Sequence, residues 1–306
     1  MILLTGATGV IGAALLPQLL SAGYEVRCLV RDPRRLGPNR VNVQLALGDF
    51  GDPHGVRHSL RGVDTVIHLA ASIRDQPPRR LEEINAIGTL RLLQAAESGG
   101  VRRFVFFSAI GASEVQRTRF FRAKAVAERA VLASSMDTTV FAPSIVYDRH
   151  DPWITLMRRM TLLPVLPISG SGEARFQPIW AREVAQSVLA ELVLAHPGTR
   201  RYELAGPETL TYNEIARTIA AATGRQRPLL HVPIPIVRSG LITLRRLVGE
   251  SVFATWEEAE LMEVPMVSER GGADVRELRG EPTPMREVLN AEEPALAGPP
   301  VTVQSP

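Results

Sequence analysis

Three glycines near the start of the chain have the spacing of a phosphate-binding turn. Gly6, Gly9 and Gly12 follow a short apolar run at residues 2–5 and precede an amphipathic run at residues 13–20. Such a turn needs residues without a Cβ where the backbone bends and where a phosphate comes close, and the helix dipole favours the negative charge. The alternative is a glycine-rich turn that only joins a strand to a helix. The context on both sides favours a dinucleotide site at Gly6, Thr8, Gly9, Val10, Ile11 and Gly12.

The position about 20 residues after such a turn lies beside the adenosine ribose. An acid there accepts hydrogen bonds from a free 2′-hydroxyl, whereas an arginine neutralises a 2′-phosphate. Counted from Gly12 this position is Arg31, which favours NADP(H) over NAD(H) unless it is one surface arginine among many. Further along, Asp49 can accept a hydrogen bond from the adenine amino group, with Phe50 beside the ring.

The elements that position these residues alternate regularly. Apolar runs at 24–30, 43–47, 64–71, 103–108 and 137–143 predict strands, and residues 79–98 and about 120–134 predict helices. In the first of these helices, one buried face is predicted for Leu81, Ile84, Ile87, Leu90 and Leu93. This alternation predicts an α/β fold, a Rossmann-type doubly wound parallel sheet. Ligands bind at the carboxyl edge of such sheets, where the strands deliver Leu69, Ala70, Ala71 and Ser108.

The domain organisation follows from where this alternation stops. We expect a dinucleotide-binding Rossmann domain at 1–150 and a small mixed α/β lobe at 151–289, which can contribute to the sheet. Residues 290–306 are rich in proline and alanine without apolar periodicity, which is typical of a disordered tail.

Several of these motifs together resemble a known family. They resemble the extended and atypical short-chain dehydrogenase/reductases, which are NAD-dependent epimerase/dehydratase-like. The resemblance is carried by residues 5–12, 48–50, 68–71 and 143–147 and by Asn85, Ser108 and Lys124. Residues 176–185 and 202–208 are similar to the NmrA-like and complex I accessory-subunit-like branch. The resemblance implies that Pro143, Val146 and Tyr147 border the nicotinamide. It also implies that Ser108 positions a substrate oxygen and that Lys124 holds the nicotinamide ribose.

The chain departs from this family at one catalytic position. Active members carry a tyrosine four residues before the lysine, and its phenol exchanges a proton with the substrate. Here that residue is Phe120, on the same helical face as Lys124. Loss of a positioned acid or base typically costs on the order of a hundred- to ten-thousand-fold in rate. We therefore favour an NADP(H)-binding accessory or sensor protein; the alternative is an NADPH-dependent oxidoreductase or epimerase-like enzyme that uses Tyr147 or water as its proton donor.

The basic residues support retention of the cofactor. The chain has 34 arginines and a single lysine, Lys124, and codon bias does not explain why one position alone holds lysine. A compact ammonium with three donors can reach both ribose hydroxyls, whereas a planar guanidinium needs a different pocket. The alternative is a leftover surface lysine.

Charge and hydropathy bound the partners. The net charge is only +3 and the basic residues are scattered, so we expect no nucleic-acid partner, and we expect no metal site. Residues 228–249 interleave apolar residues with arginines, which indicates a membrane-surface or protein-docking helix, or a lid over a small-molecule or quinone-like substrate. The absence of an apolar run of roughly 18 residues, the strand at the very start and the single Cys28 together predict a cytoplasmic protein, or one peripheral to a membrane.

Overall fold

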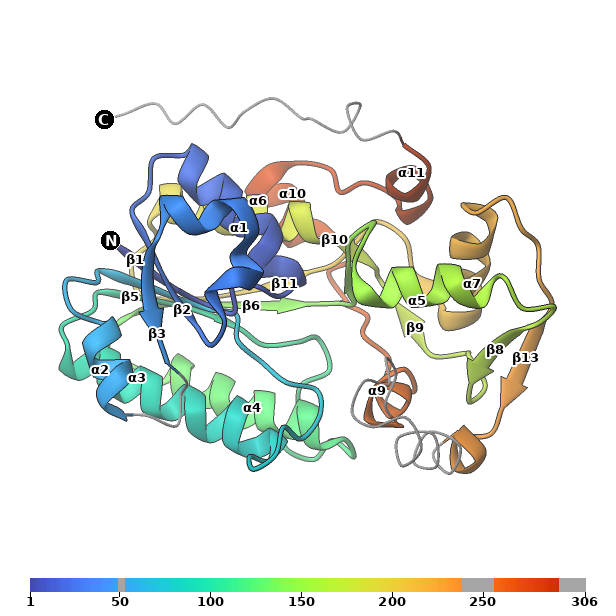
Figure 1. Cartoon of the computed structure of the whole chain (residues 1–306), viewed down its shortest axis with the longest axis horizontal. Coiled ribbons are helices and arrows are strands. Elements are labelled where there is room, and N and C mark those ends of the chain that lie inside the picture. Colours follow the sequence, from blue (N-terminus) through green and yellow to red (C-terminus); the bar gives the residue numbers. More distant parts are fainter. Residues whose placement is uncertain (49–52, 238–255, 292–306) are drawn as a thin grey trace.

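The computed structural model describes residues 1–48, 53–237 and 256–291. Its centre is a seven-stranded sheet in the order β11-β6-β5-β4-β1-β2-β3, in which all neighbouring strands are parallel. The strands are β1 (Ile2–Thr5), β2 (Val26–Val30), β3 (Gln44–Leu47), β4 (Thr65–His68), β5 (Arg103–Phe107), β6 (Asp137–Pro143) and β11 (Thr199–Leu204). This sheet confirms the predicted Rossmann-type α/β fold (Figure 1).

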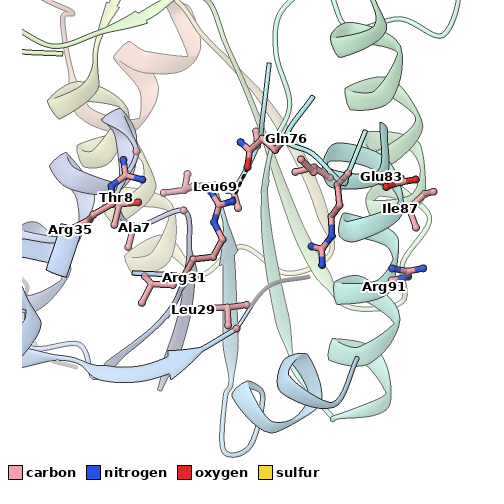
Figure 2. Close-up of a pocket in the computed structure, with 18 of the residues that line it drawn as sticks. Ala7, Thr8, Leu29, Arg31, Arg35, Leu69, Gln76, Glu83, Ile87 and Arg91 are labelled. Carbon is pink, nitrogen blue, oxygen red and sulfur yellow. Dashed lines mark hydrogen bonds between the residues drawn. The ribbon is translucent and has the colours of Figure 1, made fainter. Parts of the chain in front are cut away.

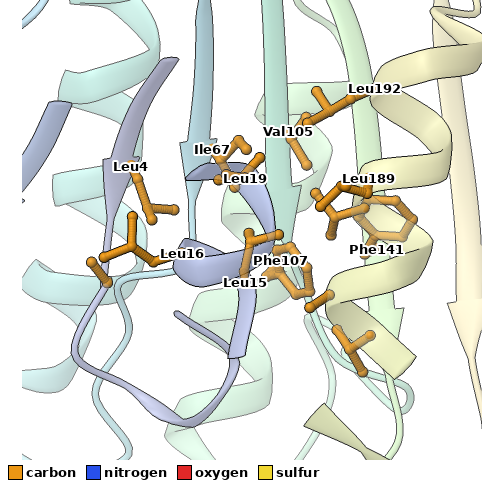
Figure 3. Close-up of a cluster of buried hydrophobic side chains, with 14 of the residues drawn as sticks. Leu4, Leu15, Leu16, Leu19, Ile67, Val105, Phe107, Phe141, Leu189 and Leu192 are labelled. Atoms are coloured by element: carbon orange, nitrogen blue, oxygen red, sulfur yellow. The ribbon is translucent and has the colours of Figure 1, made fainter. Parts of the chain in front are cut away.

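Two helical layers cover the sheet, and the alternation of side chains along each strand explains both. One layer contains α1 (Val10–Ser21), α6 (Ala181–Leu194) and α10 (Ala273–Arg279), and the other contains α2 (Pro53–Ser59), α3 (Gly88–Ser98) and α4 (Arg119–Leu132). On β5, Val105 and Phe107 pack in the core with α1 and α6, whereas Phe104 and Phe106 pack in the core with α3 and α4. Figure 3 shows the first of these cores, with Leu15 and Leu19 of α1 facing the strands. Burial on both faces accounts for the nearly continuous apolar runs of the central strands.

The helix predicted at 79–98 contains a π-helical segment, η2 (Glu83–Ile87), before α3. Leu81 and Leu93 are buried as predicted, but Ile87 is 41% exposed, so its predicted burial was wrong. A π turn adds a residue to the helical repeat and rotates the face that follows. Asn85, in this segment, is buried instead.

The remaining elements form the lobe and the connections. They are the 3-10 segment η1 (Pro33–Asn42), β7 (Val146–Tyr147), α5 (Pro152–Met160), β8 (Leu166–Ser169), β9 (Arg175–Phe176), β10 (Ile179–Trp180), β12 (Leu210–Thr211), α7 (Tyr212–Ala221), β13 (Leu229–Val232), α9 (Trp256–Leu261) and α11 (Met285–Asn290). Thr211 and Glu214 form the predicted capping box at the start of α7. A separate core lies here, with Phe176, Tyr212 and Ile215 buried together.

The chain leaves the sheet after β6 and returns to it. Between two excursions into the lobe, α6 covers the sheet and β11 pairs with β6 (Figure 1). Residues 151–289 therefore contribute to both the sheet and the lobe. Within the described ranges, every helix is too short or too polar to cross a membrane. Residues 238–249 of the predicted amphipathic segment, and 292–306 of the predicted tail, lie outside the described residues.

Candidate functional site

The glycine turn has the geometry that its sequence requires. Gly6 has φ +73°, and a Cβ added there would lie 2.6 Å from the backbone nitrogen of Ala70. A Cβ at Gly12 would lie 2.3 Å from the carbonyl oxygen of Gly6. Glycine is therefore needed at both positions, because the backbone after β4 lies against Gly6 and the turn itself lies against Gly12 in α1. Gly9 is the N-cap of α1 and provides no side-chain cap, so the turn leaves the first-turn amides of α1 for a ligand.

A cavity of about 650 Å³ opens beside this turn. Figure 2 shows that residues from the glycine turn, the end of β2, the loop after β4 and the helix at 83–91 face it from different sides. Seven of the predicted cofactor residues line it: Gly6, Thr8, Gly9, Arg31, Leu69, Ala70 and Ala71. Val10, Ile11 and Gly12 lie in the first turn of α1, next to the turn but not in the lining. Asp49 and Phe50 lie outside the described residues.

The cavity is strongly cationic. Among the described residues of its lining are four arginines, Arg31, Arg35, Arg79 and Arg91, and one carboxylate, Glu83. Arg31 extends across the cavity and donates a hydrogen bond from Nη1 to Oε1 of Gln76 at 2.7 Å (Figure 2). A lining of this kind favours a ligand with several negative charges.

Sequence reasoning missed three of these arginines and Gln76. Arg35 lies in η1, four residues after Arg31, while Gln76 and Arg79 lie on the loop after β4. Arg91 lies one helical turn after Ile87, the residue whose predicted burial was wrong. The polar face of that helix could have indicated Arg91, but a regular helical repeat places this face incorrectly because the helix contains a π turn.

Lys124 is buried, with 3% of its surface exposed. Its Nζ donates a hydrogen bond to the carbonyl oxygen of Phe107 at 2.6 Å. The same nitrogen lies 4.9 Å from the ring centroid of Phe106 and 5.9 Å from that of Phe120. Burial lowers the pKa of Lys124 to about 7, while the nearby carboxylate of Glu128 acts in the opposite direction. Lys124 is therefore not a surface lysine: it is held at the end of β5.

Ser108 also lies at the end of β5, but its hydroxyl is engaged. Oγ donates a short hydrogen bond to Oε2 of Glu128, and Oε1 of Glu128 accepts one from Nε of Arg201 at 2.7 Å. Glu128 lies one helical turn beyond Lys124 on α4. The structure therefore brings Ser108, Lys124 and Phe120 to one end of α4 and β5, outside the lining of the cationic cavity.

A buried histidine on β4 has a structural role. His68 contacts Oγ1 of Thr5 through Nδ1 at 2.7 Å and Oγ1 of Thr89 through Nε2 at 2.9 Å. Burial, with a smaller effect of Lys124, lowers its pKa to about 3. His68 is therefore neutral at physiological pH and connects β1, β4 and α3.

Tyr147 is fully buried on β7, in the second core. Its hydroxyl has no hydrogen-bond partner within the described residues. Burial raises the pKa of the phenol, and the nearby carboxylates of Glu183, Glu208 and Asp148 raise it further. Pro143 is the last residue of β6, and Val146 is the first residue of β7, three residues later. Neither residue lines the cationic cavity.

Comparisons with known proteins agree with this geometry. A family model described as NAD(P)H-binding matches residues 6–163. Sterol demethylase protein B of Methylococcus capsulatus is 31% identical over 272 residues, which are 79% of this chain and 80% of that protein. NADH dehydrogenase [ubiquinone] 1 alpha subcomplex subunit 9, mitochondrial, of Arabidopsis thaliana is 28% identical over 249 residues, 76% of this chain and 60% of that protein. The solved structure of MoeE5 in complex with UDP-glucuronic acid and NAD shares the fold, with a TM-score of 0.71, 21% identity and coverage of 94% of this chain and 96% of that one.

Proposed function

The chain belongs to the NAD(P)H-binding family of atypical short-chain dehydrogenase/reductases, and on that premise we propose that it binds NADP(H) as an accessory or sensor protein without the usual catalytic tyrosine. The observation that carries the proposal is the pair Phe120 and Lys124. The lysine that holds the cofactor is kept, and the ring that should supply the proton has no hydroxyl.

The cofactor preference rests on the adenosine side of the cavity. Arg31, directly after β2, and Arg35, four residues later in η1, lie where a 2′-phosphate is expected, and Arg79 and Arg91 add positive charge from the opposite side. A bound nucleotide would compete with Gln76 for the guanidinium of Arg31. Each charge-assisted hydrogen bond to the phosphate would favour NADP(H) over NAD(H).

The cofactor supplies the hydride in this family, and this chain's residues would hold it. Gly6, Thr8 and Gly9 would receive the pyrophosphate at the start of α1. Lys124 would release the carbonyl of Phe107 and donate to the ribose hydroxyls. Nothing at position 120 can then deliver a proton to a substrate.

The alternative is an NADPH-dependent oxidoreductase or epimerase-like enzyme in which Tyr147 or water donates the proton. The hydroxyl of Tyr147, which has no partner among residues 1–48, 53–237 and 256–291, favours this candidate, since buried hydroxyls usually have a partner. Its burial and raised pKa favour the accessory function instead.

The relatives suggest partners of two kinds. One relative is named as a subunit of NADH dehydrogenase [ubiquinone], in accord with docking to a protein partner or a membrane through 228–249 and with a quinone-like ligand. Another is named for a sterol, in accord with a small apolar substrate.

NADPH oxidation in the presence of quinones and aldehydes distinguishes the two functions. We expect binding without oxidation by the wild-type protein. Oxidation that is abolished by Tyr147→Phe would establish the alternative, and oxidation that survives this change would point to water.

A further inference from the structure

The outer end of the lobe is formed by two chain segments that lie side by side. The carbonyl oxygen of Thr161, after α5, accepts a hydrogen bond from Nε of Arg227 at 2.9 Å. The backbone nitrogen of Leu166 donates to the carbonyl oxygen of Pro228 at 2.9 Å, and β8 and β13 then run parallel. We call residues 158–167 and 225–230 the lobe tip; it lies at the far end of the molecule from β1 (Figure 1).

The lobe tip exposes large aliphatic side chains. Leu162 is 65% exposed, Leu163 is 48% exposed and Leu230 is 51% exposed. The register places Leu230 beside Pro167 on the outer face of the two-stranded sheet, while Leu166 is buried on the inner face. Single exposed leucines are ordinary, but these three belong to segments joined by the bond between Leu166 and Pro228 and by the pairing of β8 with β13, so exposed apolar side chains are concentrated at the lobe tip.

The same two segments are rich in arginine. Arg158, Arg159, Arg225 and Arg227 belong to the lobe tip, and the sequence has no aspartate or glutamate at 152–171 or 215–237. Arg158 and Arg159 lie in the last turn of α5, and the backbone nitrogen of Arg225 donates a hydrogen bond to the carbonyl oxygen of Ala220, near the end of α7. With four arginines and no acidic residue in its two segments, the lobe tip carries a net positive charge of its own.

We propose that the lobe tip binds the surface of an anionic lipid bilayer, with Leu162, Leu163 and Leu230 among the acyl chains and the arginines at the phosphate level. Exposed leucines favour an apolar environment, and arginines favour an anionic surface. An anionic bilayer provides both, because its interior is apolar and its surface carries phosphate groups.

This contact uses no residue of the cationic cavity. None of the tip residues lines the space beside the glycine turn. We therefore expect NADPH affinity in solution to be independent of the lobe tip. This affinity then reports whether the lobe-tip variants are folded. If the lipid proposal fails, the proposed function is unaffected.

The test is flotation of the full chain with vesicles. We expect binding to phosphatidylcholine vesicles that contain about one fifth phosphatidylglycerol, little binding to pure phosphatidylcholine, and loss of binding between about 0.05 M and about 0.5 M salt. The double variant Leu162→Ser with Leu163→Ser removes apolar groups that enter the bilayer and should weaken vesicle binding more than about tenfold. The double variant Arg158→Gln with Arg159→Gln should also weaken it more than about tenfold, since each basic residue near such a surface contributes about fivefold to the affinity.

Matched controls lie at other surfaces. Val193→Ser with Leu194→Ser changes two exposed aliphatics at the end of α6, and Arg57→Gln with Arg61→Gln removes two exposed arginines beside β3. Both controls should bind vesicles as the wild type does. The proposal is wrong if the wild type does not float with the vesicles, or if a control variant loses as much binding as the matching tip variant. It is also wrong if the tip variants keep their NADPH affinity and vesicle binding but lose self-association or binding to an acidic protein partner.

Discussion

The Nζ atom of Lys124 lies 5.9 Å from the centroid of the Phe120 ring, one helical turn earlier on α4. It also lies 2.6 Å from the carbonyl oxygen of Phe107, to which it donates a hydrogen bond. The lysine is thus held at the sheet edge by a backbone group and two aromatic rings, and no hydroxyl stands at position 120.

Phe120→Tyr should create activity. A phenol at this position would place a proton donor on the same helical face as Lys124. We expect NADPH oxidation with a quinone or an aldehyde to increase by about a hundredfold or more in this variant. Phe120→Leu is the control and should stay inactive. If the tyrosine variant binds NADPH and oxidises none with any acceptor, the assignment of position 120 is wrong.

Lys124 should make stability depend on pH. Its pKa is lowered in the folded state from 10.5 to about 7, so between these pH values the unfolded chain binds the extra proton and the folded chain does not. The free energy of unfolding therefore rises with pH across this window and is insensitive to this group below it. Urea denaturation at about pH 7.5 and about pH 9.5 should show a gain of up to roughly 2–3 kcal/mol from this group.

The control for this pH dependence is Lys124→Met, which keeps most of the side-chain volume. Comparison of the two proteins cancels the titration of every other group. The gain with pH should be smaller in the methionine variant by the amount that Lys124 contributes. Equal slopes in the two proteins would mean that Lys124 keeps an ordinary pKa.

Arg31→Ala should change cofactor selectivity. A charge-assisted hydrogen bond is worth about 1.5–3 kcal/mol, so NADPH should bind at least about tenfold more weakly while NADH binding changes little. Arg34→Ala removes an exposed arginine three residues later that pairs with Asp32, and it should alter neither affinity. A parallel loss of NADPH and NADH in Arg31→Ala would indicate that Arg31 does not contact a 2′-phosphate.

Arg279→Ala should destabilise the protein. The carboxylate of Glu183 is 1% exposed and accepts hydrogen bonds from Nη1 of Arg279 at 2.9 Å and from the backbone nitrogen and Oγ1 of Thr283, each at 2.8 Å. Removal of the arginine leaves a buried charge with less compensation, which typically costs about 3–5 kcal/mol. Arg276→Ala, at an exposed pair with Glu281, should cost less than about 1 kcal/mol in the same denaturation experiment.

The glycine turn and the parallel sheet could be predicted from the sequence because local sterics and apolar periodicity determine them. Gly6 and Gly12 have no space for a Cβ, so their spacing records the geometry directly. The strands β1, β4 and β5 are buried on both faces, so their apolar runs are continuous.

The rest of the site depends on contacts between distant segments. The π turn at 83–87 turns Ile87 and Arg91 toward the cavity, and a regular helical repeat cannot indicate it. Glu128, which engages Ser108, is itself fixed by Arg201, 73 residues later in the chain. The bonds of Glu128 to Ser108 and to Arg201 produce no local sequence pattern. The sequence could therefore predict Ser108 as a site residue, but not that its hydroxyl is hydrogen-bonded to Glu128.

The most direct test of the central claim is a calorimetric titration of the purified protein with NADPH and with NADH, while the absorbance of the reduced nicotinamide is followed in the presence of an acceptor. We predict one NADPH bound per chain, at least about tenfold tighter than NADH, with no oxidation. An absence of binding would contradict the cofactor site itself, and binding with steady oxidation would contradict the accessory or sensor function.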